Sequence, residues 1–249
     1  MKAVITGASS GIGRDIARAL VCRGWDVILV ARRADRLMEL KKELGARARC
    51  VRCDVSHADE CIKLHEVLKN EDIEMLVNCA GFGLCGFFDE TELDGELRMI
   101  DTNVRAVHIL TKLFLKDFIG KDKGYILNIA SIAGFFSGPL MSTYYATKNY
   151  VVSLTGAVYE ELKRRNSNVK ISAFCPGPVD TEFNKVANVK FASAPIDSKT
   201  AAKAAIDGLM AGRVYIVPTL KMKLLRFCRR LLPDRLITHI CYTFQKKKR

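Results

Sequence analysis

The chain has 249 residues, of which 49% are hydrophobic, and a formal net charge of +13. This length suits one α/β domain with a single sizeable core, and no apolar run approaches the roughly 18 residues of a membrane span. The first residues lead straight into a predicted strand with no room for a signal peptide, so we expect a cytoplasmic protein.

Strand-like and helix-like segments alternate from the first residues onward. Short apolar strands that alternate with helices are typical of a parallel sheet covered on both faces. The sequence therefore predicts a doubly wound α/β domain over residues 1–218. Its predicted strands are 3–5, 27–30, 50–55, 75–78, 124–130, 169–175 and 214–217, and its predicted helices are 12–23, 36–44, 57–69, 92–118, 144–166 and 198–212.

A glycine-rich segment, Thr6-Gly7-Ala8-Ser9-Ser10-Gly11-Ile12-Gly13, joins the first predicted strand to the first predicted helix. Glycines there let the backbone approach a pyrophosphate, and the helix N-terminus supplies free N–H groups. The spacing Gly-x-x-x-Gly-x-Gly differs from the usual dinucleotide fingerprint. A turn without a ligand is the alternative, but the strand and helix on either side favour a nucleotide site. The expected contacts are Gly7, Ser9, Ser10, Gly11, Ile12 and Gly13.

Tyr144 and Lys148 lie four positions apart in a predicted helix, so they share one face. We expect the nearby ammonium to lower the pKa of Tyr144, which would let this phenol act as an acid or base near neutrality. The hydroxyl of Ser131 could hold a substrate oxygen beside it.

Several motifs, in order, resemble those of the short-chain dehydrogenase/reductase family, from Lys2 to about Pro218. The glycine-rich segment matches its Thr-Gly-x-x-x-Gly-x-Gly motif, and Asn78-Cys79-Ala80-Gly81 is similar to its Asn-Asn-Ala-Gly. Ser131, Tyr144 and Lys148 match its catalytic set, including the 13-residue interval from serine to tyrosine. The resemblance implies a single Rossmann-type domain with a seven-stranded parallel sheet. It also implies an NAD(P)-dependent enzyme that interconverts a carbonyl and a secondary alcohol.

The resemblance assigns a role to each catalytic residue. Tyr144 would exchange a proton with the substrate oxygen, and Ser131 would hydrogen-bond that oxygen. Lys148 would lower the tyrosine pKa and bind the nicotinamide ribose, and Asn103 would hold a water molecule beside Lys148. Tyr145 breaks the family's Tyr-x-Ala-Ser/Thr-Lys pattern, so we interpret it as a packing or pocket residue. Further cofactor contacts are implied for Asp54, Val55, Asn78, Ala80, Gly81, Pro176, Gly177, Val179 and Thr181.

The end of the second predicted strand indicates which cofactor is preferred. An acid there would bind the ribose 2′-hydroxyl of NAD, whereas this chain has Ala31 followed by Arg32 and Arg33. Guanidinium groups bind a 2′-phosphate by charge-assisted hydrogen bonds. We therefore predict NADP(H) as the preferred cofactor and NAD(H) as the second option; the alternative is two solvated arginines.

Loops that follow the strands carry apolar residues, which either line a pocket for a lipophilic substrate or pack as ordinary loops. A steroid ketone or a 3-ketoacyl derivative would suit such a pocket, and residues 182–197 resemble the family's substrate lid. From other classes, a non-catalytic NADPH-binding regulator or a membrane-associated scaffold are the alternatives. The apolar loop residues are Phe82, Leu84, Phe135, Phe136, Leu140 and Met141.

The nine cysteines and four histidines show no metal-ligand spacing. Cys50 and Cys53 would point to opposite faces of an extended segment, which argues against a redox or zinc site. We expect reduced cysteines that fill the core, and no metal.

The tail, residues 219–249, departs from the family. Between Lys221 and Arg249 ten basic residues accompany one acid, Asp234, giving this segment +9. Two amphipathic helical stretches are separated by Pro233. We expect them to pack on the same domain, as a lid or as a surface of a homo-oligomer (dimer or tetramer). The alternative is contact with an anionic membrane at its inner face; nucleic acid is disfavoured because interleaved aromatic residues are missing.

Overall fold

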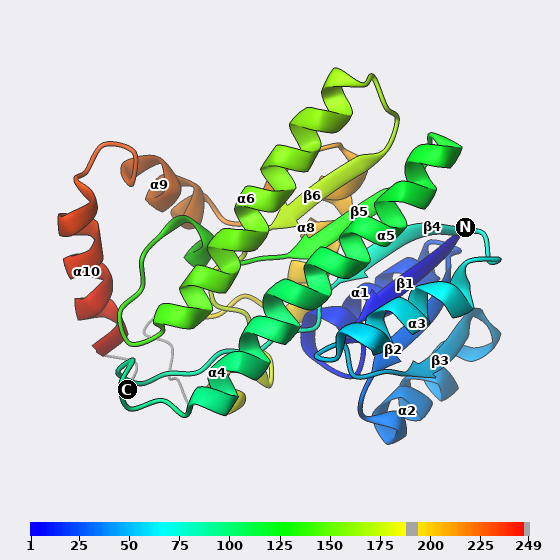
Figure 1. The fold of residues 1–249 in the computed structure, drawn as a ribbon, viewed down its shortest axis with the longest axis horizontal. Coiled ribbons are helices and arrows are strands. Elements are labelled where there is room, and N and C mark those ends of the chain that lie inside the picture. The colour runs from blue at the N-terminus through cyan, green and yellow to red at the C-terminus, as the bar shows by residue number, and fades with distance from the viewer. Residues whose placement is uncertain (188–193, 247–249) are drawn as a thin grey trace.

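Seven parallel strands form one sheet in the order β3-β2-β1-β4-β5-β6-β7 (Figure 1). The computed structural model describes residues 1–187 and 194–246. The predicted lid therefore lies partly outside the described residues, at 188–193, and so does the end of the tail, at 247–249. The strands are β1 (Lys2–Thr6), β2 (Asp26–Ala31), β3 (Ala48–Arg52), β4 (Ile73–Asn78), β5 (Tyr125–Ile129), β6 (Lys170–Phe174) and β7 (Tyr215–Ile216).

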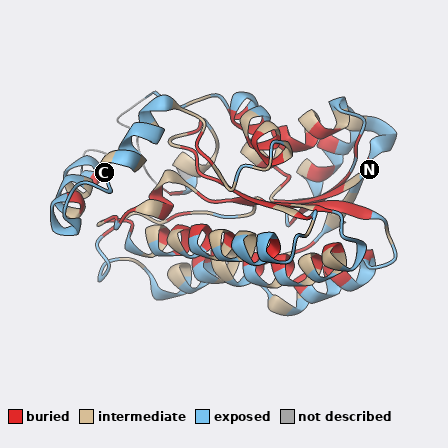
Figure 2. Cartoon of the chain, turned by 90° about the horizontal axis from the view of Figure 1, so that it is seen from above, coloured by how far each residue is buried: buried red, intermediate tan, exposed pale blue. Residues whose placement is uncertain are grey.

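Helices cover both faces of this sheet, which Figure 2 shows edge-on. On one face lie α1 (Gly11–Cys22), α2 (Ala34–Leu44) and α8 (Ser198–Met210). The other face is covered by α3 (Ala58–Leu68), α5 (Ala106–Lys121) and α6 (Ser142–Arg164). The predicted doubly wound Rossmann-type architecture is thus confirmed. The remaining helices are α4 (Leu93–Ile100), α7 (Phe183–Val186), α9 (Leu220–Cys228) and α10 (Asp234–Lys246).

The strands are apolar because helices cover both faces of the sheet. In β1, Ala3 and Ile5 belong to the core beneath α1 and α8, while Val4 belongs to the core beneath α3 and α5. Successive side chains point to opposite faces of a strand, so a central strand between two helical layers has to be apolar at every position. All three side chains are fully buried.

One predicted strand ends earlier in the structure than the sequence indicated. The third strand ends at Arg52 rather than at residue 55, because the Asp54 carboxylate accepts hydrogen bonds from the backbone N–H and the hydroxyl of Ser56. Such an aspartate turn leads the chain out of the ladder. The helices predicted over 92–118 are α4 and α5, and a π-helical turn, Asp101–Arg105, joins them.

The strand order reverses between β1 and β4, and in doubly wound folds ligands bind in the crevice outside the carboxyl ends of the strands at this switch point. The segments that follow β1, β4, β5 and β6 carry most of the predicted site residues. Among residues 1–187 and 194–246, no helix combines the length and hydrophobicity needed to cross a bilayer.

Candidate active site

The glycine-rich loop after β1 lies against the segment after β4. The Thr6 hydroxyl accepts hydrogen bonds from the backbone N–H groups of Cys79 and Ala80 at 3.0 and 3.2 Å. Gly7 has φ 68°, and a Cβ there would lie 2.7 Å from the Ala80 nitrogen, so only glycine permits this approach. α1 begins at Gly11 without a side-chain cap from Ser10. Its first turn therefore keeps N–H groups suited to a phosphate.

Arg33 lies over this loop. Its Nε and Nη2 donate to the Ser9 hydroxyl at 3.2 and 3.0 Å, and Nη2 also donates to the Ser10 hydroxyl at 2.9 Å. Arg32 is more exposed and lies 3.6 Å from a carboxylate oxygen of Asp54. Of the two residues that we predicted to recognise the 2′-phosphate, the structure thus places Arg33 on the phosphate loop and Arg32 beside Asp54.

Glu182 is the first residue of the predicted substrate lid, and its carboxylate binds two arginines near the loop. It accepts a hydrogen bond from Arg33 Nη1 at 2.9 Å and one from Arg36. Hydrogen bonds from Arg36 and Arg33 lower the pKa of Glu182 to about 2. The preceding residue, Thr181, also reaches the loop, because a Cβ on Gly11 would lie 2.9 Å from its methyl carbon. The segment after β6 therefore crosses over the predicted phosphate site.

The other predicted cofactor residues have mixed surroundings. The Asn78 amide nitrogen donates to Thr111 at 3.1 Å and to Asn128 at 2.9 Å, so this side chain joins β4 to α5 and β5 inside the fold. The Asn78 Oδ1 has no hydrogen-bond partner within the described part of the chain. Val55 and Val179 are buried core residues, and the Pro176 carbonyl accepts a hydrogen bond from the Ile132 N–H.

Three residues from two elements meet at the predicted catalytic centre. Ser131 caps the 3₁₀ helix Ile132–Phe135 after β5, and a hydrogen bond joins its side chain to that of Tyr144 in α6. Lys148 lies one turn further along α6, with its Nζ 5.9 Å from the centroid of the Tyr144 ring. Its ammonium also donates to the Ile129 carbonyl at 2.8 Å. The structure therefore groups the three side chains as the sequence predicted.

The pKa values of this centre correct one expectation. Burial raises the pKa of Tyr144 to about 12, while the hydrogen bond from Ser131 acts in the opposite direction. The predicted lowering by Lys148 is wrong for the protein chain alone. The physical reason is that desolvation of the phenolate dominates. Burial likewise lowers the pKa of Lys148 to about 8, so the lysine is itself close to losing its proton near neutrality.

Asn103 lies in the π-helical turn and is fully buried. Its Oδ1 accepts from the Phe82 N–H at 3.1 Å, and its Nδ2 donates to the Phe82 carbonyl at 2.9 Å and to the Thr147 hydroxyl at 3.1 Å. Gly81 lies between Asn103 and Lys148, since a Cβ there would be 2.9 Å from Asn103 Oδ1 and 3.5 Å from Lys148 Nζ. Asn103 thus fixes the loop after β4 against the catalytic helix.

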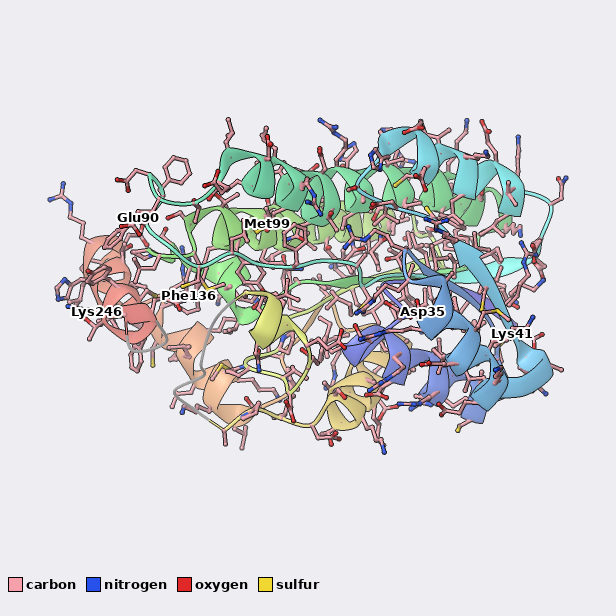
Figure 3. The ribbon with its side chains drawn as sticks, turned by 90° about the horizontal axis from the view of Figure 1, so that it is seen from below. Asp35, Lys41, Glu90, Met99, Phe136 and Lys246 are labelled. Atoms are coloured by element: carbon pink, nitrogen blue, oxygen red, sulfur yellow. The ribbon has the colours of Figure 1, made fainter. Side chains whose placement is uncertain are left out.

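An apolar cluster surrounds the Tyr144 ring. Three of the six apolar loop residues named above pack in it, namely Phe82, Leu84 and Met141. Phe135 instead packs beneath α9, while Phe183 of α7, which sequence reasoning did not single out, lies 5.3 Å from the Tyr144 ring between centroids. The other members include Met99, labelled with Phe136 in Figure 3, and Ala133, Cys85, Tyr145 and Ala187.

Leu140 is a residue of the site region whose backbone the sequence did not reveal. It adopts φ 66°, a conformation that few residues other than glycine take. Its carbonyl accepts a hydrogen bond from the Gly86 N–H at 2.9 Å. The strained turn thereby ties the start of α6 to the loop after β4, and such strain is characteristic of functional sites.

Replacing Lys148 by Met should abolish turnover and yet stabilise the fold. The folded-state pKa of about 8 lies below the unfolded value of about 10.4, so the unfolded chain binds more protons between these values and stability rises with pH there. Below pH 8 the buried ammonium destabilises the fold. Met removes this cost but loses the hydrogen bond to the Ile129 carbonyl. We therefore expect the free energy of unfolding to rise by about 1–2 kcal/mol at pH 7.

Urea unfolding at pH 7 and pH 10 measures this effect. The gain should vanish at pH 10, where Lys148 is uncharged in the folded chain. Lys163→Met, at an exposed position of the same helix, should leave stability nearly unchanged at both pH values. A destabilised Lys148→Met variant at pH 7 would contradict a net cost of burying the ammonium.

Comparisons with known proteins agree on one family. The family model for short chain dehydrogenase matches residues 1–190. An uncharacterized oxidoreductase of Staphylococcus saprophyticus is 34% identical over 213 residues, which are 83% of this chain and 90% of that protein. The very-long-chain 3-oxoacyl-CoA reductase of Homo sapiens is 32% identical over 192 residues, covering 74% of this chain and 61% of that protein.

Solved structures share the fold over nearly the whole chain. A short-chain dehydrogenase/reductase from Burkholderia phymatum in complex with NAD has a TM-score of 0.84 at 26% identity, with 92% of each chain covered. A short-chain dehydrogenase from Sphingobium yanoikuyae in complex with NADPH has a TM-score of 0.83 at 28% identity, with 92% of this chain and 93% of that chain covered.

Proposed function

Because this chain belongs to the short-chain dehydrogenase/reductase family, we propose that it is an NADPH-dependent reductase of lipophilic carbonyl compounds, reversible as an alcohol dehydrogenase. Family membership makes it an NAD(P)-dependent oxidoreductase. The observation that carries the finer proposal is the grouping of Ser131 and Lys148 around Tyr144, whose ring belongs to an apolar cluster.

The residues present fit a dinucleotide, since Gly7 and Gly11 leave no room for a side chain and Arg33 adds positive charge. NADPH, when bound, supplies the hydride that reduces the carbonyl carbon. Tyr144 then gives its hydroxyl proton to the substrate oxygen. Ser131 donates a hydrogen bond to the same oxygen as negative charge develops, a contribution of about 2–4 kcal/mol for comparable donors. The Lys148 ammonium stabilises the phenolate that remains.

NADPH is proposed over NADH because of Arg32 and Arg33. Both follow β2, where Ala31 supplies no carboxylate to bind a ribose 2′-hydroxyl. The NADPH complex of the Sphingobium structure supports this choice, and the NAD complex of the Burkholderia structure keeps NADH as the second cofactor.

The substrate class is proposed from the apolar surroundings of Tyr144 and from one relative. Phe82, Met141 and Phe183 leave mainly hydrocarbon beside the phenol, which suits a bulky apolar carbonyl compound. The relative named as a 3-oxoacyl-CoA reductase favours a 3-ketoacyl thioester as a second candidate. A non-catalytic NADPH-binding regulator would not need the complete Ser131, Tyr144 and Lys148 set.

NADPH consumption across steroid ketones, 3-ketoacyl thioesters and aliphatic or aromatic ketones tests the proposal. We expect turnover to concentrate on one lipophilic class. Turnover restricted to small hydrophilic carbonyl compounds would contradict the substrate proposal. Tight NADPH binding without turnover on any class would favour the regulator.

A further inference from the structure

The helix α9 contacts the rest of the protein through Met222 and Arg226. The Arg226 guanidinium lies 4.5 Å from the centroid of the Phe135 ring and 4.6 Å from that of Tyr215. Met222, one turn earlier, packs against Gly177, where a Cβ would lie 3.0 Å from the Met222 sulfur. An amphipathic helix of a soluble domain normally buries its apolar stripe, whereas α9 turns a cation toward the fold.

The apolar stripe of α9 consequently faces solvent. Leu220, Leu224, Phe227 and Leu231 follow one another at intervals of four, three and four residues, which places them on one side of a helix. Their exposed fractions are 81%, 63%, 59% and 70%. The stripe begins on α9 and continues into the turn after it.

The helix α10 also exposes an apolar row. Ile237 and Gln245 are buried against the protein, and the Gln245 amide donates to the Tyr145 hydroxyl. Leu236, Ile240 and Phe244 remain 45%, 37% and 58% exposed. Figure 2 shows both helices at one end of the molecule, with much exposed surface. We call the seven exposed side chains the tail surface: Leu220, Leu224, Phe227, Leu231, Leu236, Ile240 and Phe244.

The charges around the tail surface identify the kind of partner. The described part of the tail contains many basic residues but one acid, Asp234. This carboxylate lies 3.8 Å from Arg229. A second copy of the chain would bring two strongly positive surfaces together. An anionic bilayer instead accepts apolar side chains at the headgroup boundary and attracts the lysines and arginines around them. Besides Arg226, which lies against the fold, the basic residues are Lys221, Lys223, Arg229, Arg230, Arg235 and Lys246.

We propose that the tail surface docks the protein on anionic lipid bilayers, with α9 and α10 lying in the headgroup region. Because no described helix can span a membrane, the contact is peripheral. It goes beyond the proposed reaction and does not depend on it.

Vesicle co-sedimentation of the full chain tests the proposal. We expect binding to vesicles of phosphatidylcholine with phosphatidylglycerol, at least about tenfold weaker binding to phosphatidylcholine alone, and release by high salt. The double substitution Leu224→Ser with Phe227→Ser should weaken binding by about tenfold or more, because it removes two inserted apolar side chains. The matched control is Ile62→Ser with Val67→Ser on α3, where Ile62 is 44% and Val67 57% exposed. This control should bind vesicles like the wild type.

Sedimentation equilibrium without vesicles decides between a bilayer and a second copy. If the tail variant dissociates a dimer while vesicle binding is absent or unchanged, the surface is an interface between copies and the proposal is overturned. Equal binding to neutral and anionic vesicles would also overturn it. The NADPH dissociation constant of each variant shows whether the fold is retained. Since no turnover is measured, failure here leaves the proposed reaction untouched.

Discussion

Replacing Tyr144 by Phe should lower the rate of carbonyl reduction by about 10²–10⁴-fold, the usual contribution of a positioned proton donor. The ring would remain, so its packing against Phe183 should persist and NADPH should bind nearly as before. Only the hydroxyl that is hydrogen-bonded to Ser131 is removed. The measurement is single-turnover NADPH oxidation on the best substrate, together with the NADPH dissociation constant.

Tyr145→Phe is the matched control, because it removes a phenol one residue away. The Tyr145 hydroxyl accepts a hydrogen bond from Gln245, so its loss should affect the seating of α10 far more than the chemistry. The ring, which packs beside Gly138, is kept. If Tyr145→Phe were the more damaging change, the assignment of the proton donor to Tyr144 would be wrong.

Replacing Arg32 and Arg33 together by Ala should raise the NADPH dissociation constant by about 10- to 100-fold. A hydrogen bond to a charged group contributes about 1.5–3 kcal/mol, and every 1.4 kcal/mol is a factor of about ten in affinity. Fluorescence titration of the wild type and the double variant with NADPH measures the change.

NADH titration of the same two proteins is the control. Arg33 also holds the Ser9 and Ser10 hydroxyls, so the double variant should lose some affinity for NADH through a less ordered phosphate loop. We expect this loss of NADH affinity to be several times smaller than the loss of NADPH affinity. Equal losses for the two cofactors would exclude recognition of a 2′-phosphate by these arginines.

The strands and helices were predictable because their signals are local. Val4 and its neighbours in β1 form an apolar run bounded by a glycine-rich turn, and Gly24, at φ 82°, ends α1 where the sequence indicated. The end of β3 was not predictable from apolar content. Cys53 and Val55 are as apolar as a strand requires, but the Asp54 side chain bonds to Ser56 instead.

The candidate site was predictable where spacing within one element fixes geometry, as for Tyr144 and Lys148. It was missed where the contact joins distant segments. Phe183 packs on Tyr144 and Gln245 reaches Tyr145. The sequence marked the segments that hold them, as a lid and as a packing tail, but not which side chain of each makes the contact. The pKa of Tyr144 was predicted in the wrong direction because burial depends on the whole cluster around the ring, which a four-residue spacing does not reveal.

Glu182 competes with a cofactor phosphate for the arginines of the predicted cofactor site. Its carboxylate forms ion pairs with both Arg33 and Arg36, so a phosphate that reaches Arg33 has to displace it or share the guanidinium with it. The affinity for NADPH then reflects the replacement of one anion, the Glu182 carboxylate, by another, the phosphate. It does not report the binding of a phosphate to unpaired arginines. Glu182 also belongs to the segment that leads into α7 and Phe183. Because Phe183 directly follows Glu182, any displacement of Glu182 by a phosphate would act on the side chain that packs against the Tyr144 ring.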